Sequence, residues 1–380
     1  MKFEKPERDL AIDWLRVFAM AVVFLFHCAR FFDTQGWHVK NPDSDLVLTF
    51  FVLFVSQWMM PLFFILSGIS TFYMLSYRNT GAFIKSRFTR LLVPFIFGTL
   101  LLAPPQVYIE RITEHEFTGS YLEFYPHYFD GFYAFGGNFA WMGLHLWYLQ
   151  MLFVYSLLFL PLFAYLQKEK HRESISNMAQ LFKRRGTIFA LALPLALLEF
   201  ILDPEGIGRR DFGGWSFFLY MIFFIYGYVI FTHPQLKPII NNNGKIALIG
   251  AIIATSIALI LLVVIGFPPY GGSPYFLFMT TLRAFISWSW LIAIYCFGRK
   301  HFTGNHRFLR YANEAVLPFY ILHQTLIVII AFYFIHWDTG VYLKYAALCI
   351  ASFVSICLIY ELLLRRINIL RFLFGLKPRR

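Results

Sequence analysis

The chain has 380 residues, of which 59% are hydrophobic, 21% aromatic and only 14% charged. With a mean hydropathy of +0.60, this composition excludes a soluble globular protein and indicates an integral membrane protein. The formal net charge of +12 does not indicate a nucleic-acid partner, because the basic residues flank apolar stretches.

Ten apolar stretches are long enough to cross the roughly 30 Å hydrocarbon core of a bilayer as helices. They cover residues 10–32, 46–76, 82–108, 144–166, 187–203, 213–232, 246–266, 275–297, 313–335 and 341–364. The second and third are over-long and contain Pro61, Pro94, Pro104 and Pro105, so we expect tilted, kinked or broken helices there. The sequence therefore predicts an all-α polytopic bundle of about ten transmembrane helices, a single membrane domain over residues 1–380 without a separate soluble domain.

The positions of lysine and arginine predict the orientation of this bundle. Of the 33 basic residues, 25 lie in the terminal segments, the alternate connections and the adjoining ends of the stretches, six lie in or next to the opposite connections, and Arg16 and Arg283 lie deeper within stretches. Because basic residues stay on the cytoplasmic side, we expect both termini to be cytoplasmic. Of the 21 acidic residues, 12 fall on the outer side and support this orientation: Asp33, Asp43, Asp45, Glu110, Glu114, Glu116, Glu123, Asp130, Asp203, Glu205, Asp211 and Asp338.

The longest outer connection, about residues 109–143, is rich in aromatic and acidic residues. Such a composition argues against disorder. Its rings suit either anchoring at lipid headgroups or stacking on sugars, and the sequence leaves both open. The four cysteines have no metal-like spacing, so we expect no metal site.

Two ionisable residues share one face of the first stretch. Arg16 and His27 are eleven residues apart, which on a helix returns to within roughly 20° while rising about 16 Å. Ionisable groups in a membrane helix normally face a bundle interior or a wet cavity and mark a functional site. The alternative is an arginine that extends to the interface and a histidine held in the core.

A basic pair, Arg87 and Arg90, opens the third stretch in KSRFTRLLVP. Their spacing puts two guanidinium groups on one helix face near its N-terminal end, which suits a phosphorylated cytosolic donor. The preference for basic residues on the cytoplasmic side explains the pair equally well.

Two further histidines belong to the membrane region, His145 in GLHLWYLQ and His323 in LPFYILHQ. Each is a candidate site residue or a core histidine. Ser67 and Gly68 in FFILSGIS are small residues that favour close helix packing.

Together these motifs resemble the acyltransferase 3 family of multispanning membrane acyltransferases. The resemblance rests on Arg16 and His27, FFILSG, Arg87 and Arg90, HLWYL and LPFYILH, and it covers essentially the whole chain. IDWLRV, HLWYL and LPFYILHQ are closest to the branch that succinylates periplasmic glucans. The resemblance implies a bacterial inner-membrane enzyme that moves an acyl group, succinyl in this branch, from cytosolic acyl-CoA to a hydroxyl of an extracytoplasmic glycan.

The residues take roles that suit this reaction. His27 is the expected general base, with Arg16 as a catalytic partner supported by Asp13 at i−3. Arg87 and Arg90 are expected to bind the phosphates of CoA. The candidates for the acceptor or acyl pocket are His145, Trp147, Arg283, His323 and Glu314. We expect no permanently bound cofactor, acyl-CoA as co-substrate, and membrane lipid and a glycan acceptor as partners.

Arg283 is the candidate receiver of a succinyl carboxylate, because it lies in the outer half of its stretch at about the depth of His27. The alternatives are a salt bridge to Glu314, Asp203 or another acid, or an arginine that extends to the outer interface.

Other functions remain open at this stage. Acetyl transfer to another envelope glycan or a small acceptor fits the same residues. A transporter or flippase of an anionic or sugar-linked substrate would also bury arginine and histidine, but it is expected to have paired repeats, which the sequence lacks. A non-enzymatic membrane sensor would explain a polar core without chemistry.

Overall fold

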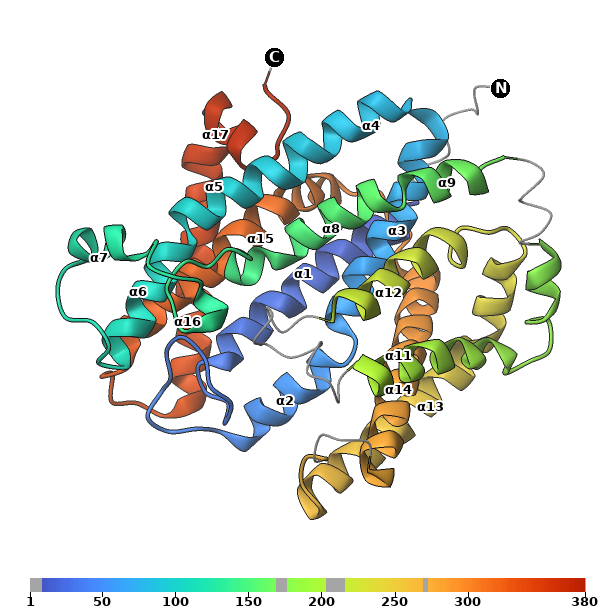
Figure 1. Cartoon of the computed structure of the whole chain (residues 1–380), viewed down its shortest axis with the longest axis horizontal. Helices are drawn as coiled ribbons and strands as arrows, with labels where there is room; N and C mark the ends of the chain where they lie inside the picture. Colours follow the sequence, from blue (N-terminus) through green and yellow to red (C-terminus); the bar gives the residue numbers. More distant parts are fainter. Residues whose placement is uncertain (1–8, 169–175, 203–215, 269–272, 380) are drawn as a thin grey trace. The chain divides into compact units, whose positions relative to one another are not determined.

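The computed structural model describes residues 9–168, 176–202, 216–268 and 273–379 (Figure 1). Within these ranges all regular secondary structure is helical, apart from one isolated β-bridge between Phe132 and Phe139. The prediction of an all-helical membrane protein is therefore confirmed for the described part of the chain.

The ten predicted apolar stretches coincide with helices, but not all of these helices are long. Seven described segments are long and apolar enough to cross a membrane: α1 (Leu10–Arg30), α2 and α3 together (Leu46–Ser56, Met59–Tyr77), the segment Thr80–Thr113, α13 (Leu236–Val264), α14 (Pro274–His301), α15 (Arg307–Phe334), and α16 with the π-helix η6 (Val341–Ile359, Tyr360–Leu364).

The remaining three stretches are broken or shorter. Leu144–Leu158, which comprises η3 (Leu144–Leu146) and α8 (Trp147–Leu158), meets α9 (Leu160–Leu166) at a bend of 52°. The segment Thr187–Leu202, made of η4 (Thr187–Leu191) and α11 (Ala192–Leu202), and α12 (Phe217–Val229) are shorter apolar helices. The count of ten spans and the cytoplasmic termini stay predictions.

The breaks predicted in the two over-long stretches are present. Helices α2 and α3 are separated at Gln57 and Trp58. The segment Thr80–Thr113 consists of α4 (Thr80–Arg87), a π-helix η1 (Phe88–Leu92), α5 (Val93–Leu101) and α6 (Ala103–Thr113). Pro104 and Pro105 lie in the first turn of α6, where proline is tolerated because its missing N–H would be unpaired.

The chain forms two compact units that interleave in sequence. Unit 1 comprises residues 1–19, 56–84 and 154–306, and unit 2 comprises residues 20–55, 85–153 and 307–380. Helix α1 contributes its first half to unit 1 and its second half to unit 2. A single membrane domain over the whole chain stays a prediction.

Close glycine contacts hold α3 against α12 in unit 1. A Cβ atom at Gly68 would lie 2.1 Å from the Phe224 carbonyl oxygen, and one at Gly227 would lie 2.2 Å from the Ile65 carbonyl oxygen. Both glycines therefore permit backbone contact between the helices. This confirms the packing interpretation of FFILSGIS.

Helix α13 shows the surface expected of a membrane helix. It packs against α14 within unit 1 (Figure 1) and leaves a run of large aliphatic side chains exposed: Leu248, Ile249, Ile252, Ile253, Ile260, Val263 and Val264. A soluble protein rarely exposes so much contiguous apolar surface, whereas lipid solvates it without cost. The exposed faces thus support a membrane-embedded, multi-pass protein.

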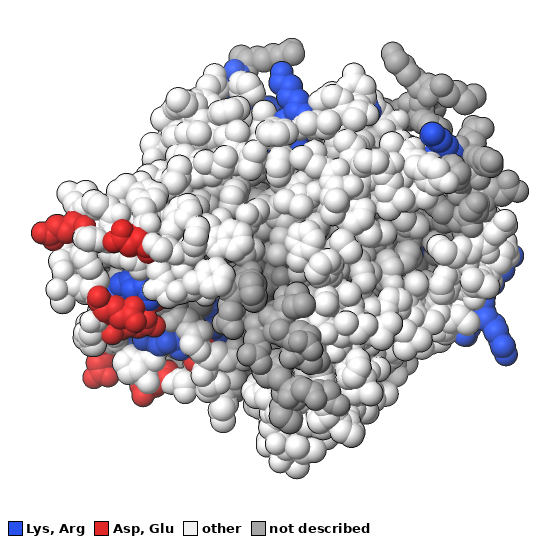
Figure 2. All heavy atoms as spheres, viewed as in Figure 1, with Lys and Arg blue, Asp and Glu red and all other residues white. Residues whose placement is uncertain are grey.

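In unit 2, the aromatic connection that follows α6 forms a folded cap. Its short helix α7 (Tyr121–His127) begins with a capping box between Ser120 and Glu123, and the 3-10 turn η2 (Tyr133–Phe135) follows. The side chains of Phe124 and Tyr128 are fully buried against α6. Figure 2 shows acidic side chains gathered over α6 and α7, where Glu114, Glu116, Glu123 and Asp130 are exposed.

Candidate functional site

Three histidine rings meet inside unit 2. They come from α1 (His27), η3 (His145) and α15 (His323). The ring centroids of His27 and His323 are 4.8 Å apart, and those of His145 and His323 are 5.2 Å apart, both edge to face. The structure therefore brings together three of the site residues predicted from the sequence.

The hydrogen bonds of this cluster leave one ring nitrogen open. Nδ1 of His27 lies 2.9 Å from the Val23 carbonyl oxygen, which can only accept, so this nitrogen carries the proton. In His323, Nδ1 donates to the Tyr320 carbonyl oxygen at 2.6 Å, and Nε2 lies 3.2 Å from Nδ1 of His27. Within the described chain, Nε2 of His27 has no hydrogen-bond partner. It is the atom placed to take a proton.

His145 is held by an unusual backbone turn. Gly143 and Leu144 both have positive φ, 72° and 52°, and a Cβ at Gly143 would lie 2.8 Å from the Thr99 hydroxyl. The turn lets Nε2 of His145 donate to the Ile321 carbonyl oxygen at 3.0 Å, while Tyr320 donates its hydroxyl proton to the His145 carbonyl. Such strain persists where the surroundings over-determine the conformation.

A pair of buried glutamines extends the cluster. Nε2 of Gln106 lies 3.4 Å from Nδ1 of His145 and 2.8 Å from the Thr325 hydroxyl. Oε1 of Gln106 accepts a hydrogen bond from Nε2 of Gln324 at 3.0 Å. Nε2 of Gln324 also lies 3.2 Å from Nε2 of His38. An unbroken row of buried polar side chains therefore runs from His145 to His38.

The row ends at a histidine–carboxylate pair beneath the cap. Nδ1 of His38 donates to Glu110, which also accepts from the Tyr133 hydroxyl at 2.7 Å. Burial raises the pKa of Tyr133, and the nearby Glu110 carboxylate raises it further, so the phenol stays a donor. The Trp37 ring lies between the two histidine sites, 6.4 Å from the His27 ring and 5.8 Å from the His38 ring.

This second group of residues was not predicted from the sequence. His38 lies in the connection after α1, Glu110 counted only as an outer acid, and Gln106 and Gln324 are neutral. A polar residue inside an apolar stretch was the available signal for the glutamines. Nothing in the sequence links His38 to Glu110, which lies 72 positions away.

Arg16 has the partner predicted for it. In unit 1 its Nη1 lies 3.0 Å from Oδ1 of Asp13, and its Nη2 donates to the Ser70 hydroxyl. This pair lies in the half of α1 that belongs to unit 1, whereas His27 lies in the half that belongs to unit 2.

Arg87 and Arg90 do not share one environment. Arg87, the last residue of α4, is buried, and Arg90, inside the π-helix η1, is exposed. A π-helix has more residues per turn than an α-helix, so residues three apart no longer share a face. Both arginines also lie well after Thr80, where the helix begins, so the expected contribution of helix N-terminal amides is absent.

Two residues predicted for the acyl pocket, Arg283 and Glu314, each form an ion pair within the protein. In unit 1, Arg283 binds Glu199 with both Nε (3.1 Å to Oε2) and Nη2 (2.8 Å to Oε1). In unit 2, Glu314 accepts from Arg371 at 2.9 Å and lies nine residues before His323 on α15. The alternative of a salt bridge between Arg283 and another acid is thus the one observed, and Asp203 lies outside the described residues.

Trp147 is buried at the start of α8, two residues after His145. It lies in the segment that the positive-φ turn positions, and its role in an acceptor pocket stays a prediction.

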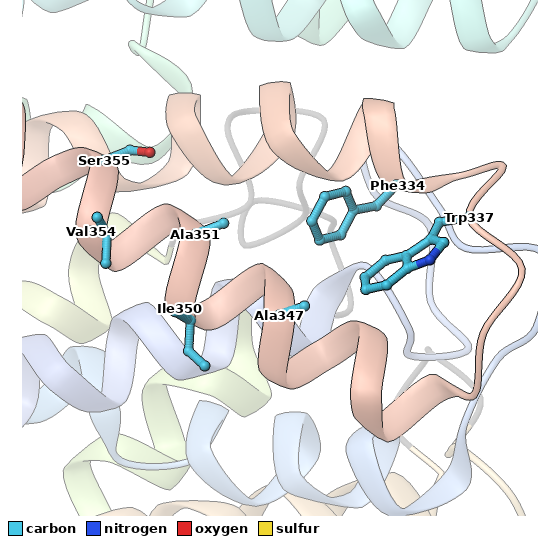
Figure 3. Close-up of a pocket in the computed structure, with 7 residues that line it drawn as sticks. All are labelled: Phe334, Trp337, Ala347, Ile350, Ala351, Val354 and Ser355. Carbon is cyan, nitrogen blue, oxygen red and sulfur yellow. The ribbon is translucent and has the colours of Figure 1, made fainter.

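A separate groove opens on the surface of unit 2 (Figure 3). Its volume is about 660 Å³, and its walls are Phe334, Trp337 and side chains of α16 that are apolar except for Ser355. No titratable side chain lines it, so it offers no acid–base chemistry.

Comparison with known proteins assigns the family. The family model described as an acyltransferase domain, of the acyltransferase 3 type, matches residues 9–361, and the chain belongs to this family. Glucans biosynthesis protein C of Salmonella schwarzengrund is 26% identical over 389 positions, which cover 98% of this chain and 95% of the relative. The protein of the same name from Escherichia coli K12 is 24% identical over 384 positions with the same coverage. No solved structure matches.

Proposed function

We propose that this acyltransferase moves a succinyl group from cytosolic acyl-CoA to a hydroxyl of an extracytoplasmic glycan, with His27 as the general base. One observation carries the proposal. Of the six ring nitrogens in the histidine cluster, Nε2 of His27 alone has no hydrogen-bond partner in the described chain. The relatives named glucans biosynthesis protein C support a glucan as the acceptor.

The chemistry needs a positioned base because a sugar hydroxyl is a weak nucleophile. In the proposed step, Nε2 of His27 removes the hydroxyl proton as the oxygen attacks the thioester carbonyl. A C–O bond forms, the C–S bond breaks, and the thiolate of CoA then takes the proton from His27. Because Nδ1 of His27 faces the Val23 carbonyl and Nε2 of His323, the transient positive charge on the ring is stabilised.

The basic residues take the donor roles. Arg87 and Arg90 would bind the phosphates of CoA at the predicted cytoplasmic face, and Arg16 would balance charge near the donor. His145 and Trp147 would form a wall of the acceptor site, since both ring nitrogens of His145 already have protein partners.

The test is acyl transfer by the purified protein in detergent. Succinyl-CoA and a neutral β-glucan are supplied, free CoA is measured with a thiol reagent, and the glucan is analysed by mass spectrometry. We expect CoA release together with a mass increase of the glucan by one succinyl group. CoA release without glucan modification would remove the acceptor assignment, and glucan movement into proteoliposomes without CoA release would favour a transporter.

A further inference from the structure

Three basic side chains gather at the end of α1 that follows His27. Arg30 is the last residue of α1, Lys40 lies in the connection that folds back over it, and Lys344 lies in the first turns of α16. All three belong to unit 2. The C-terminal end of a helix favours cations, which explains why they gather there.

Two of these cations, Arg30 and Lys40, form ion pairs with the same carboxylate. Asp33, which is fully buried, accepts from Arg30 and lies 2.7 Å from Nζ of Lys40. Arg30 also donates to Gln35 and the Gly36 carbonyl, and Lys40 donates to the Arg30 carbonyl at 2.7 Å. Burial lowers the pKa of Lys40, and the adjacent Asp33 opposes this effect. These contacts fasten the connection to α1.

Lys344 differs from both because it lacks an acidic partner. Its side chain is 4% exposed, and its ammonium donates to the neutral side-chain oxygen of Asn41 at 2.8 Å. Asn41 is itself fixed by its backbone N–H to the Phe31 carbonyl, at 2.8 Å. Within the described chain the ammonium of Lys344 has no other partner, so two of its three N–H donors are open.

Within the described chain, the acidic residues of the connection that carries Asn41 form no ion pair with Lys344. Asp45 caps α2 through the Leu48 N–H at 2.8 Å and accepts a hydrogen bond from Tyr342. Asp43 is exposed and contributes its backbone carbonyl to Asn41. A buried ammonium without an anion is costly, and an ionisable residue in a membrane helix marks a functional site by default.

We propose that Lys344, held by Asn41, receives the distal carboxylate of a dicarboxylic acyl group such as succinyl, and so selects the donor. This inference rests on the proposed function. An acyl group that enters from the CoA side extends past its thioester, away from the phosphates. The three carbon–carbon bonds from the thioester carbon to the succinyl carboxylate span about 4 Å. Lys344 is held through Asn41 to the carbonyl of Phe31, which lies about 6 Å farther along the axis of α1 than His27.

Lys344 is better placed than Arg283 to bind the carboxylate of a succinyl group. Arg283 already binds the buried carboxylate of Glu199 through two nitrogens, so a second carboxylate would have to compete with it. At Lys344 an incoming carboxylate would not have to displace a carboxylate of the protein.

The first experiment uses the unmodified protein. Succinyl-CoA and butyryl-CoA have the same chain length and differ in having a carboxylate or a methyl group at the end. We expect the wild type to favour succinyl-CoA by at least tenfold in kcat/KM for CoA release, because a charge-assisted hydrogen bond contributes about 10- to 100-fold. This measurement does not depend on whether any variant folds.

The second experiment compares three variants. Lys344→Met should lower the succinyl to butyryl ratio by about 10- to 100-fold while butyryl turnover is retained. Lys344→Arg keeps the charge and should preserve most of the preference. Arg283→Met, the matched control, should leave the ratio unchanged.

The outcomes separate this inference from the proposed function. Equal use of the two donors by the wild type, or a ratio that follows Arg283 and not Lys344, would overturn the carboxylate site while leaving acyl transfer intact. No CoA release from either donor would overturn the proposed function and this inference with it.

Discussion

Nε2 of His323 lies 3.2 Å from Nδ1 of His27, although the two residues are 296 positions apart in the chain. His323 is fully buried, and its own Nδ1 is fixed by the Tyr320 carbonyl at 2.6 Å. Nε2 of His323 therefore presents its lone pair to the Nδ1–H of His27. His323 is placed to orient the proposed base, as a third group does in other sites that contain a nucleophile and a base.

Replacing His27 tests the proposed base directly. His27→Gln keeps hydrogen bonding but cannot take a proton, so kcat should fall by about 10² to 10⁴ while the affinity for CoA stays the same. The measurements are CoA release and CoA binding by the same detergent-purified protein. Retention of more than about a tenth of the rate would rule out His27 as the base.

His323 should act through His27. In His323→Leu one of the two acceptors of the Nδ1–H of His27 is lost and only the Val23 carbonyl remains, so we expect kcat to fall about 10- to 100-fold with the KM for acyl-CoA unchanged. His323→Gln can place an oxygen near the position of Nε2 and should recover part of the rate. An equal loss in both variants, or a rise in KM alone, would contradict a positioning role.

Arg87 and Arg90 should respond differently to salt. Arg90 is exposed, so Arg90→Ala should weaken CoA binding at low ionic strength and matter less at about 1 M salt, where the screening length is about 3 Å. Arg87 is buried, so the loss in Arg87→Ala should persist at high salt. The check is a titration of CoA at both salt concentrations. Unchanged affinity in the double variant would remove both arginines from the donor site.

The Arg283–Glu199 pair should matter for stability. Glu199 is 4% exposed, so Arg283→Met leaves a buried carboxylate without its guanidinium. We expect a loss of about 1–3 kcal/mol, smaller than for a fully buried pair because the Arg283 side chain is 48% exposed. Arg283→Met combined with Glu199→Met should regain most of it. Thermal unfolding in detergent gives the comparison, and an additive loss in the double variant would contradict the pairing.

Gly143 and Gly136 form a matched pair of glycines with positive φ, 72° and 84°. A Cβ at Gly136 meets open space, whereas one at Gly143 meets Thr99 and Phe95 within 2.9 Å. Gly136→Ala should therefore cost about 1 kcal/mol from backbone strain, and Gly143→Ala about 2–4 kcal/mol after adding overlap. Only Gly143→Ala should also reduce transfer, because the turn positions His145. Equal shifts in unfolding temperature would refute the role of packing at this turn.

The helices and part of the site could be predicted from the sequence because the signals are local. Apolar length defines a membrane helix, so each of the ten stretches coincides with helical structure. The pair formed by Asp13 and Arg16 follows from i,i+3 geometry on one helix. The break after Ser56 and the proline-started helix α6 follow from the excess length and the prolines.

The sequence by itself determined the membrane class, the helical segments and three of the histidines that the structure brings together, since these depend on composition and short-range spacing. Only the tertiary structure decided which polar groups meet. Gln106 and Gln324 are 218 positions apart, Arg283 and Glu199 are 84 apart, and Lys344 and Asn41 are 303 apart. The residues next to each of these side chains in the sequence give no indication of its partner. Each side chain acquires a partner only when helices pack and exclude water, because a buried polar group must then find its hydrogen bond within the protein.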